Sequence, residues 1–293
     1  NFYRKCYVQN NMIPIVTGDL EFENVVNLAQ KHYGQMQASD LPERITPVWP
    51  DLVGTKILTH YSDKIYQPVF YRLFRAPSFS QSPEEALALR VLKEMIGGKP
   101  TTYLHEDIVR RKKLASSIAL YYSPHSRYQN SMVIQAVPSE GVSLETLSEE
   151  IEQSLSRLAQ QGIDETKMAY AKDRLIARTI YSRDSLSGPA MITGRALTTG
   201  ATLQDIESWD EKIQKISPGQ VQNVLNKYIV SPSSAGVQGF IGPAPDRDKS
   251  ADKQKQPDVE PSEKQQIETQ SKDLSKDGAE SKPNSADSEE ARK

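Results

Sequence analysis

Two groups of side chains in this sequence have the types that hydrolytic chemistry uses. Ser123, His125 and Asp107 match a nucleophile, a base and an orienting acid, and His105, Glu106 and Asp107 are types that bind metal ions. A catalytic triad is recognised by the spatial roles of its members, about which nearness in sequence says little. Acids are also favoured at the start of a helix by its dipole, which explains the second group more simply. Neither group predicts a catalytic site by itself.

The other polar motifs also have simple structural explanations. His60 lies in an alternating strand pattern, and His32 lies near the end of a helix pattern, where a cation is favourable. Gly97-Gly98-Lys99 follows a helix pattern, whereas a phosphate-binding loop follows a strand, so we expect these glycines to end that helix. The single cysteine, Cys6, allows no internal disulfide and no thiolate metal cluster.

Composition divides the 293 residues into two parts. Residues 244–293 carry 10 Lys or Arg and 13 Asp or Glu, no aromatic residue and few large aliphatic residues. Such a segment buries too little apolar surface to offset its ordering entropy, so we expect a disordered, charged tail. The rest is nearly neutral, which argues against nucleic-acid binding, because that function needs a clustered excess of Lys and Arg. No stretch approaches about 18 consecutive apolar residues, so we expect no membrane span in this chain.

The first 54 residues predict a small unit and a connection. Residues 12–16 predict a strand, and the helical spacing of apolar residues from Phe22 to Tyr33 predicts a helix that ends at Gly34. One strand and one helix are too small to be a domain, so they must pack on something else. Residues 39–54 contain three prolines without periodicity, which is typical of an interdomain linker.

The remaining pattern predicts an α+β domain. Strands are predicted at residues 56–61, 69–74, 114–122, 131–137 and 234–241. Helices are predicted at residues 83–96, 101–113, 143–161, 165–176, 185–199, 203–215 and 218–228, with Ser82 and Asp164 as caps. Strands followed by helices and a return strand indicate helices packed on one face of a mostly antiparallel sheet.

Four segments together resemble one enzyme family. Residues 2–19 (FYRKCYVQNNMIPIVTGD) resemble the "Y-x-P-N-N-A … V-x-G-D" segment of the pitrilysin/insulysin-type zinc metallopeptidases, the group that includes the mitochondrial processing peptidases. Residues 91–98 (VLKEMIGG), 103–115 and 185–200 are similar to the second homologous domain of that group. The resemblance covers roughly residues 2–241, in the right order and spacing.

The resemblance implies two similar α+β domains that close around an unfolded peptide. Residues 1–38 would be the last strand and helix of the N-terminal, zinc-bearing domain, and residues 39–54 the linker. Residues 55–243 would be the C-terminal, substrate-clamping domain, and residues 244–293 the charged tail. The start of the first domain would then lie upstream of Asn1, which fits a chain that opens without Met.

The chain differs from the family in the zinc-binding motif. Members that cleave peptides hold zinc through an inverted His-x-x-Glu-His motif and a distal Glu, and the Glu of the motif is the general base. None of His32, His60, His105 and His125 stands in that pattern. We therefore expect zinc in the complete enzyme but no metal ligand and no catalytic residue in this chain. The motif would lie upstream of Asn1, in a partner subunit, or nowhere at all.

A second departure concerns the substrate. The family has an Arg and a Tyr seven positions apart that contact the substrate backbone, and the equivalent positions here hold Val109 and Ser116. Neither residue fits. The adjacent Arg110 and Arg111 could reach the cleft and are our candidate substrate-binding residues, the alternative being solvated charges on a helix surface.

Two functions are consistent with this pattern. The first is the C-terminal part of a zinc-dependent metalloendopeptidase that encloses and hydrolyses extended peptides, in which this part supplies the clamp and substrate surface and is inactive alone. The alternative is a non-catalytic structural or peptide-binding partner subunit of a zinc-bearing peptidase of the same family, which the missing Arg and Tyr favour. An unrelated α+β interaction domain would require every segment match to be chance. The compartment stays open, with the cell envelope favoured over the cytoplasm if the protein is bacterial.

Overall fold

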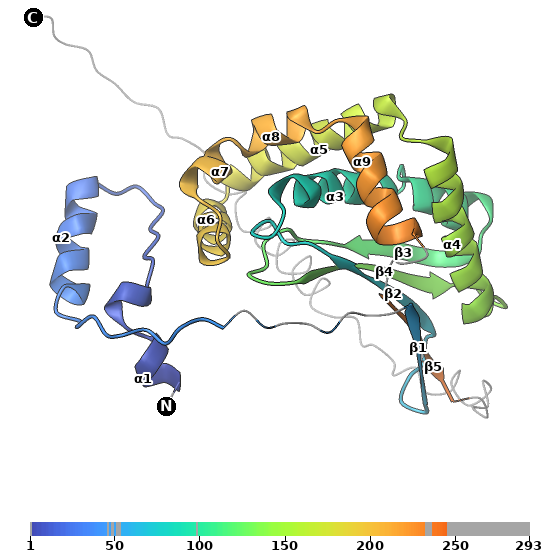
Figure 1. Ribbon diagram of the computed structural model, residues 1–293, viewed down its shortest axis with the longest axis horizontal. Helices are drawn as coiled ribbons and strands as arrows, with labels where there is room; N and C mark the ends of the chain where they lie inside the picture. Colours follow the sequence, from blue (N-terminus) through green and yellow to red (C-terminus); the bar gives the residue numbers. More distant parts are fainter. Residues whose placement is uncertain are drawn as a thin grey trace, which may run out of the picture. The chain divides into compact units, whose positions relative to one another are not determined.

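The computed structural model describes residues 2–45, 47, 50, 54–97, 99–231 and 236–244, without the side chain of Arg183 (Figure 1). These residues belong to one compact unit of the chain, residues 1–245. The predicted tail lies outside the described residues from position 245 onward, and the predicted linker is described only in part.

A mixed sheet forms the centre of the described fold. Its strands are β1 (Thr55–Ser62), β2 (Val69–Ala76), β3 (Ala115–Tyr121), β4 (Asn130–Pro138) and β5 (Gly236–Pro243). Their order is β1-β5-β2-β4-β3, with β1 parallel to β5 and the other three pairings antiparallel. The predicted α+β class with a mostly antiparallel sheet is therefore confirmed.

Helices make up most of the rest of the described chain. They are α1 (Phe2–Cys6), α2 (Phe22–Tyr33), α3 (Pro83–Ile96), α4 (Leu144–Gln161), α5 (Glu165–Arg183), α6 (Gly188–Thr198), α7 (Leu203–Glu207), α8 (Trp209–Lys215), α9 (Pro218–Leu225), the 3-10 turn η1 (Gln9–Asn11) and the π-helical segments η2 (His105–Arg111) and η3 (Asn226–Val230). Figure 1 shows α3, α4, α5, α8 and α9 above the same face of the sheet. None of the described helices combines the length and the apolar composition that a membrane crossing requires.

Strand alternation separates the two faces of the sheet. In β2, Phe70 and Phe74 are fully buried beneath the helices, whereas Tyr71 and Leu73 on the opposite face are only half-buried. Helix α3 contacts β3 on one side and α5, α8 and α9 on the others, so it lies between the sheet and an outer helix layer. This position explains why α3 is apolar over most of its circumference.

Capping residues fix the starts of the long helices. Ser143 and Asp164 each accept a hydrogen bond from the third backbone N–H of the helix that follows, at 3.1 and 3.0 Å. Such a cap stabilises a helix by about 1 kcal/mol. Ser82 stands at the same position before α3 but makes no such bond, so α3 begins instead with Pro83, whose fixed φ suits the first helical position.

Four predicted elements differ from the structure in type or are interrupted, and the helix predicted at residues 165–176 is longer, since α5 continues to Arg183. Residues 12–16 form no strand, because no described strand lies beside them to share their backbone hydrogen bonds. The helix predicted at residues 101–113 is shorter and π-helical in η2. The helix predicted at residues 203–215 breaks at Ser208, whose N–H closes α7 before α8 begins. The helix predicted at residues 218–228 leaves α-helical geometry after Leu225 and continues as η3.

The N-terminal segment packs loosely on the rest of the described chain. Neither α1 nor α2 contains a buried residue. Thr17 donates a hydrogen bond of 2.7 Å to the backbone oxygen of Leu186, and Ile15 packs near Gly194 in α6. The predicted helix of this segment is confirmed as α2, with Gly34 as its C-cap.

Candidate substrate-facing site

The candidate substrate-binding residues lie at the end of η2. The side chains of Arg110 and Arg111 are 63% and 70% exposed, and each pairs with the acid four residues earlier, Glu106 and Asp107. The turn that follows leads straight into β3. Both guanidinium groups are therefore accessible. The Arg110–Glu106 pair is exposed on both sides and contributes less than about 1 kcal/mol, so a stronger acidic partner could replace it, whereas Arg111 pairs with a buried carboxylate.

Asp107 fixes this end of η2 to α4. Its Oδ2 accepts hydrogen bonds from the Ser154 hydroxyl at 2.6 Å and from Arg157 at 3.0 Å, although the residue is only 4% exposed. Burial alone would raise the pKa of Asp107, but the bonds from Ser154, Arg111 and Arg157 outweigh it and hold the pKa below its ordinary value. Asp107 therefore stays charged and positions Arg111 on the α4 side of the sheet.

The structure does not assemble the triad types noted in the sequence. Asp107 is bonded by η2 and α4 side chains, whereas His125 lies beside Phe79, with ring centroids 6.3 Å apart and the rings tilted by 42°. The described part of the chain contains no hydrogen bond from His125 to Ser123 or to Asp107. His105, Glu106 and Asp107 lie in η2, where both acids pair with arginines rather than with a metal.

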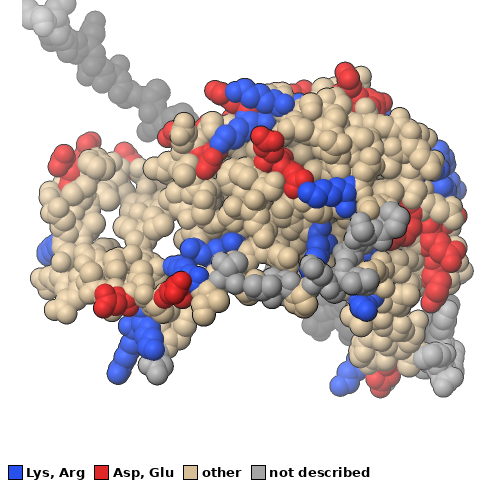
Figure 2. Space-filling view, viewed as in Figure 1, with Lys and Arg blue, Asp and Glu red and all other residues tan. Residues whose placement is uncertain are grey.

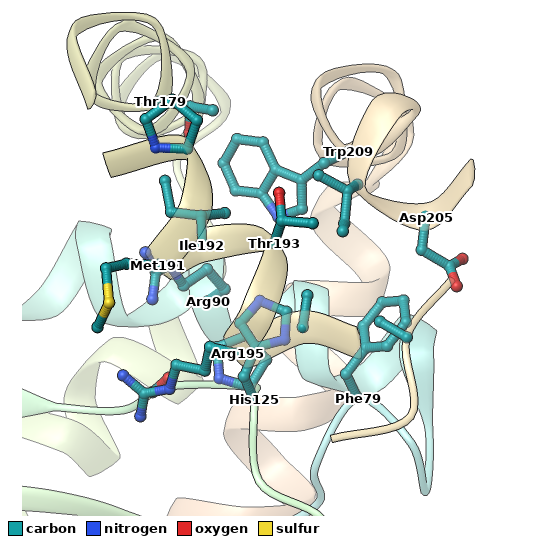
Figure 3. Close-up of a pocket in the computed structure, with 16 residues that line it drawn as sticks. Phe79, Arg90, His125, Thr179, Met191, Ile192, Thr193, Arg195, Asp205 and Trp209 are labelled. Atoms are coloured by element: carbon teal, nitrogen blue, oxygen red, sulfur yellow. The ribbon is translucent and has the colours of Figure 1, made fainter. Parts of the chain in front are cut away.

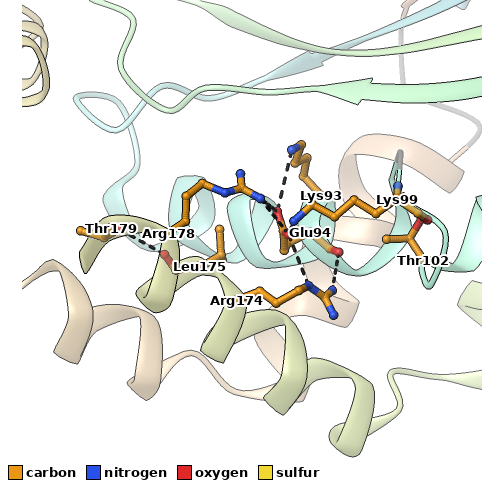
Figure 4. A network of polar contacts seen from close by, with 8 residues as sticks. All are labelled: Lys93, Glu94, Lys99, Thr102, Arg174, Leu175, Arg178 and Thr179. Atoms are coloured by element: carbon orange, nitrogen blue, oxygen red, sulfur yellow. Dashed lines mark hydrogen bonds and ion pairs between the residues drawn. The ribbon is translucent and has the colours of Figure 1, made fainter. Parts of the chain in front are cut away.

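A buried carboxylate links α3 to α5. Glu94 is 1% exposed and accepts hydrogen bonds from Lys99, from Arg174 at 3.4 Å and from Arg178 at 3.1 Å (Figure 4). Arg174 also donates to the Glu94 backbone oxygen at 3.0 Å. Burial by itself would raise the pKa of Glu94, but the bond from Lys99 and the charges around it hold that pKa below its ordinary value. This carboxylate is an anchor between two helices.

The sheet face away from the helices is open. Its side chains include Leu58 and Tyr121, which are 63% and 55% exposed, and the half-buried Leu73, Val133 and Ile241. Strands β1 and β3 form the two edges of the described sheet. On the molecular face drawn in Figure 2, the described basic and acidic side chains are interspersed rather than separated. Among the described residues, Leu58, Leu73, Tyr121, Val133 and Ile241 make the sheet face away from the helices largely apolar.

A comparison with protein families decides the assignment. The family described as the peptidase M16 inactive domain has a sequence model that matches residues 1–175, which is more than half of the chain. This chain belongs to the peptidase M16 inactive-domain family. The assignment confirms the resemblance to pitrilysin/insulysin-type zinc metallopeptidases.

Relatives of this M16 domain are larger proteins. Zinc protease PqqE of Helicobacter pylori is 22% identical over 244 residues, which cover 83% of this chain and 54% of that protein. The crystal structure of a protease from Helicobacter pylori superposes with a TM-score of 0.69 at 20% identity, covering 78% of this chain and 54% of that one. The periplasmic protease PqqL of Escherichia coli gives a TM-score of 0.58 at 14% identity, covering 78% of this chain and 25% of that one. This M16 chain thus spans about half the length of each of the two Helicobacter proteins and about a quarter of the Escherichia coli protein.

The described residues of this M16 domain do not fit a zinc site. Among the described residues, no three His, Cys, Asp or Glu side chains gather closely enough to hold a metal ion. Zinc in proteins takes nitrogen, sulfur or carboxylate donors, but the most buried acid, Glu94, is surrounded by Lys99, Arg174 and Arg178. These cations supply the positive charge that a metal would supply.

Sequence reasoning missed this anchor of the M16 domain. Glu94 lies in a segment that resembles the family, but its role depends on Arg174 and Arg178, which lie 80 and 84 residues away in the sequence. A usable signal was present: Glu94 stands among apolar residues in the second half of α3, and buried acids are almost always paired.

Proposed function

We propose that this chain is the C-terminal part of a zinc-dependent metalloendopeptidase that encloses and hydrolyses extended peptides. The observation that carries the proposal is the open, largely apolar sheet face in a domain of this family. Exposing apolar side chains to water is unfavourable, and exposed apolar patches of this kind mark interaction surfaces. Opposite a zinc-bearing domain it forms one wall of an enclosure, and this chain supplies that wall and not the metal.

The N-terminal segment supports the division into two domains. Phe22, Val25, Val26, Ala29 and Tyr33 form one stripe of α2, yet none of them is buried, and Phe22 is 76% exposed. An amphipathic helix gains most of its stability from packing its apolar face. Residues 1–38 are therefore the end of the zinc-bearing domain, residues 39–54 the linker, residues 55–243 the clamping domain and residues 244–293 a charged tail.

The chemistry is divided between the two domains. When bound in the other domain, zinc supplies an activated water and polarises the scissile carbonyl. This chain excludes water by closing over the peptide, which strengthens electrostatic interactions inside. Arg110 exchanges Glu106 for acidic groups or backbone carbonyls of the peptide, to which guanidinium groups bind well, and Arg111 keeps its bond to the buried Asp107 and offers its remaining N–H groups to the same peptide.

The alternative is a non-catalytic partner subunit of a zinc-bearing peptidase. Val109 and Ser116 stand where family members carry the Arg and Tyr that contact substrate, and this observation favours it. In either case the partners are a peptide and a zinc-bearing domain or subunit. The periplasm is the proposed compartment, supported by the periplasmic protease PqqL among the structural neighbours.

Reconstitution tests the proposal. The 293-residue chain is assayed with a quenched fluorescent peptide and zinc, alone and together with the polypeptide encoded in frame upstream of Asn1. We expect no chelator-sensitive hydrolysis by the chain alone and hydrolysis once the upstream part is added. Chelator-sensitive hydrolysis by the chain alone would overturn the proposal that this chain supplies no metal site. An upstream sequence without the inverted zinc motif would favour the alternative, a non-catalytic partner subunit.

A further inference from the structure

A cavity of about 610 Å³ lies beneath α6, outside the candidate site (Figure 3). This volume is typical of sites for small ligands. The walls come from α3, α5, α6, α7 and α8 and from the loops that carry Phe79 and His125. Large apolar side chains, among them Phe79, Ile192 and Trp209, form much of the surface.

Two arginines give this cavity an unusual charge. Arg90 of α3 and Arg195 of α6 both line it, and Figure 3 shows them grouped with His125. Within the part of the chain that the structure describes, no acceptor takes a hydrogen bond or ion pair from either guanidinium group. Asp205 also lines the cavity, but its carboxylate is bound by Lys212 at 2.6 Å and points away from the arginines in Figure 3.

The arginines change the neighbouring groups. Burial lowers the pKa of Arg90, and the charge of Arg178 lowers it further. Glu94 has the opposite effect, but its charge is already neutralised by Lys99, Arg174 and Arg178. Burial and the charges of Arg90 and Arg195 lower the pKa of His125. The Nδ1 atom of His125 is buried without a hydrogen-bond partner among the described residues. A half-buried guanidinium without a counter-ion costs stability, and a bound anion would recover it.

The mouth of the cavity is accessible. On α6, Met191 and Ile192 are 71% and 38% exposed. The same helix is approached by Ile15, and the turn before it receives the hydrogen bond from Thr17. The cavity thus opens on the helix that adjoins the N-terminal segment.

We infer that this cavity binds the C-terminal residue of a peptide. The α-carboxylate pairs with Arg90 and Arg195, and a large apolar side chain packs against Phe79, Ile192 and Trp209. A guanidinium pair suits a carboxylate because the bonds are charge-assisted and directional. The identification of the ligand as a peptide rests on the proposed function. The preference for a ligand that is both anionic and apolar rests on the residues of the cavity itself.

Binding is measured with the 293-residue chain and no zinc, so the result does not depend on hydrolysis. The chain contains two tryptophans, Trp49 and Trp209, so a Trp49→Phe variant reports Trp209 fluorescence alone, and calorimetry gives an independent measure. The probes are acetyl-Gly-Gly-Phe with a free carboxylate, its C-terminal amide, acetyl-Gly-Gly-Gly and decanoate. We expect the amide and the all-glycine peptide to bind at least tenfold more weakly than the first probe. Equal binding of acid and amide, or decanoate binding more tightly than the peptide acid, would overturn the inference.

Variants separate binding from structure. Arg90→Met and Arg195→Gln should each weaken the peptide acid at least tenfold, while Lys215→Gln, which removes a charge from a side chain 79% exposed, should leave its affinity unchanged. Arg90→Met should also melt at the same or a higher temperature, because it removes an unpaired, half-buried cation. If Arg90→Met does not fold, Arg195→Gln decides, since that side chain is exposed. Unchanged affinity in Arg195→Gln would contradict the inference.

Discussion

Arg178 of α5 places its Nη2 atom 3.1 Å from Oε1 of Glu94 in α3, so an exposed cation reaches a carboxylate that is only 1% exposed. The contact joins α3, which lies between the sheet and the outer helices, to α5 in that outer layer. It also explains how an acid is tolerated in a helix with nine buried residues, because the charge is compensated from three sides.

Replacing this carboxylate should destabilise the domain. Glu94→Gln keeps the shape but loses charge-assisted hydrogen bonds, so we expect the free energy of unfolding to fall by roughly 1–3 kcal/mol in urea denaturation. The loss stays moderate because Arg174 and Arg178 are partly exposed and regain water. Glu106→Gln, which removes an exposed pair, should change stability by about 0.5 kcal/mol or less. Equal losses of stability in Glu94→Gln and Glu106→Gln would contradict the role of Glu94 as an anchor between α3 and α5.

Asp205 should make the free energy of unfolding depend on pH in the acidic range. The hydrogen bonds from Lys212 and Thr202 lower its pKa from 3.8 to about 2. Because the folded pKa lies below the unfolded one, this stabilisation is fully present above about pH 4 and is lost as the pH falls through 2. Thermal melts of Asp205→Asn should therefore lie below those of the unchanged protein at pH 6 and converge with them near pH 2. Lys212→Gln should move the acid-dependent range to higher pH, and a constant difference at all pH values would count against this reasoning.

Gly97 should not tolerate a side chain. Its φ of −115° suits any residue, but a Cβ atom there would lie 2.2 Å from Cβ of Leu120 in β3. Gly97→Ala must therefore push α3 from the sheet, at a cost of about 1–3 kcal/mol in the free energy of unfolding. Gly219→Ala is the matched control, because the nearest heavy atom is 3.9 Å away and alanine favours the helix α9 by up to about 1 kcal/mol. The two variants should shift the melting temperature in opposite directions.

Arg110 should affect substrate binding more than stability. Its side chain is exposed and pairs only with Glu106 among the described residues, so Arg110→Gln should change the free energy of unfolding by about 0.5 kcal/mol or less. In the reconstituted enzyme we expect a higher KM for peptides with acidic residues and an unchanged kcat, because uniform binding is lost. Lys215→Gln serves as the charge control. An unchanged KM would leave Arg110 as a solvated surface charge.

Local patterns predicted most of the elements. The alternation in β2 and the caps Ser143 and Asp164 act between near neighbours in sequence, so their effects can be read without the fold. The prediction failed where the outcome depends on distant partners. Residues 12–16 have strand-like composition, but a strand needs a neighbour, and no described strand lies beside them. The break at Ser208, by contrast, has a local cause that apolar spacing does not reveal, because the N–H of Ser208 bonds back to Gln204 and closes α7.

The sequence by itself determined the family, the α+β class and the lack of an inverted zinc motif, because these depend on residue types, order and short spacing. Only the tertiary structure decided which charges meet. Glu94 and Arg178 are 84 residues apart in the chain, and Arg90 and Arg195 lie on different helices, yet each pair shares one environment. The physical reason is that burial and Coulomb interactions depend on distance in space and on access of water, neither of which sequence spacing encodes.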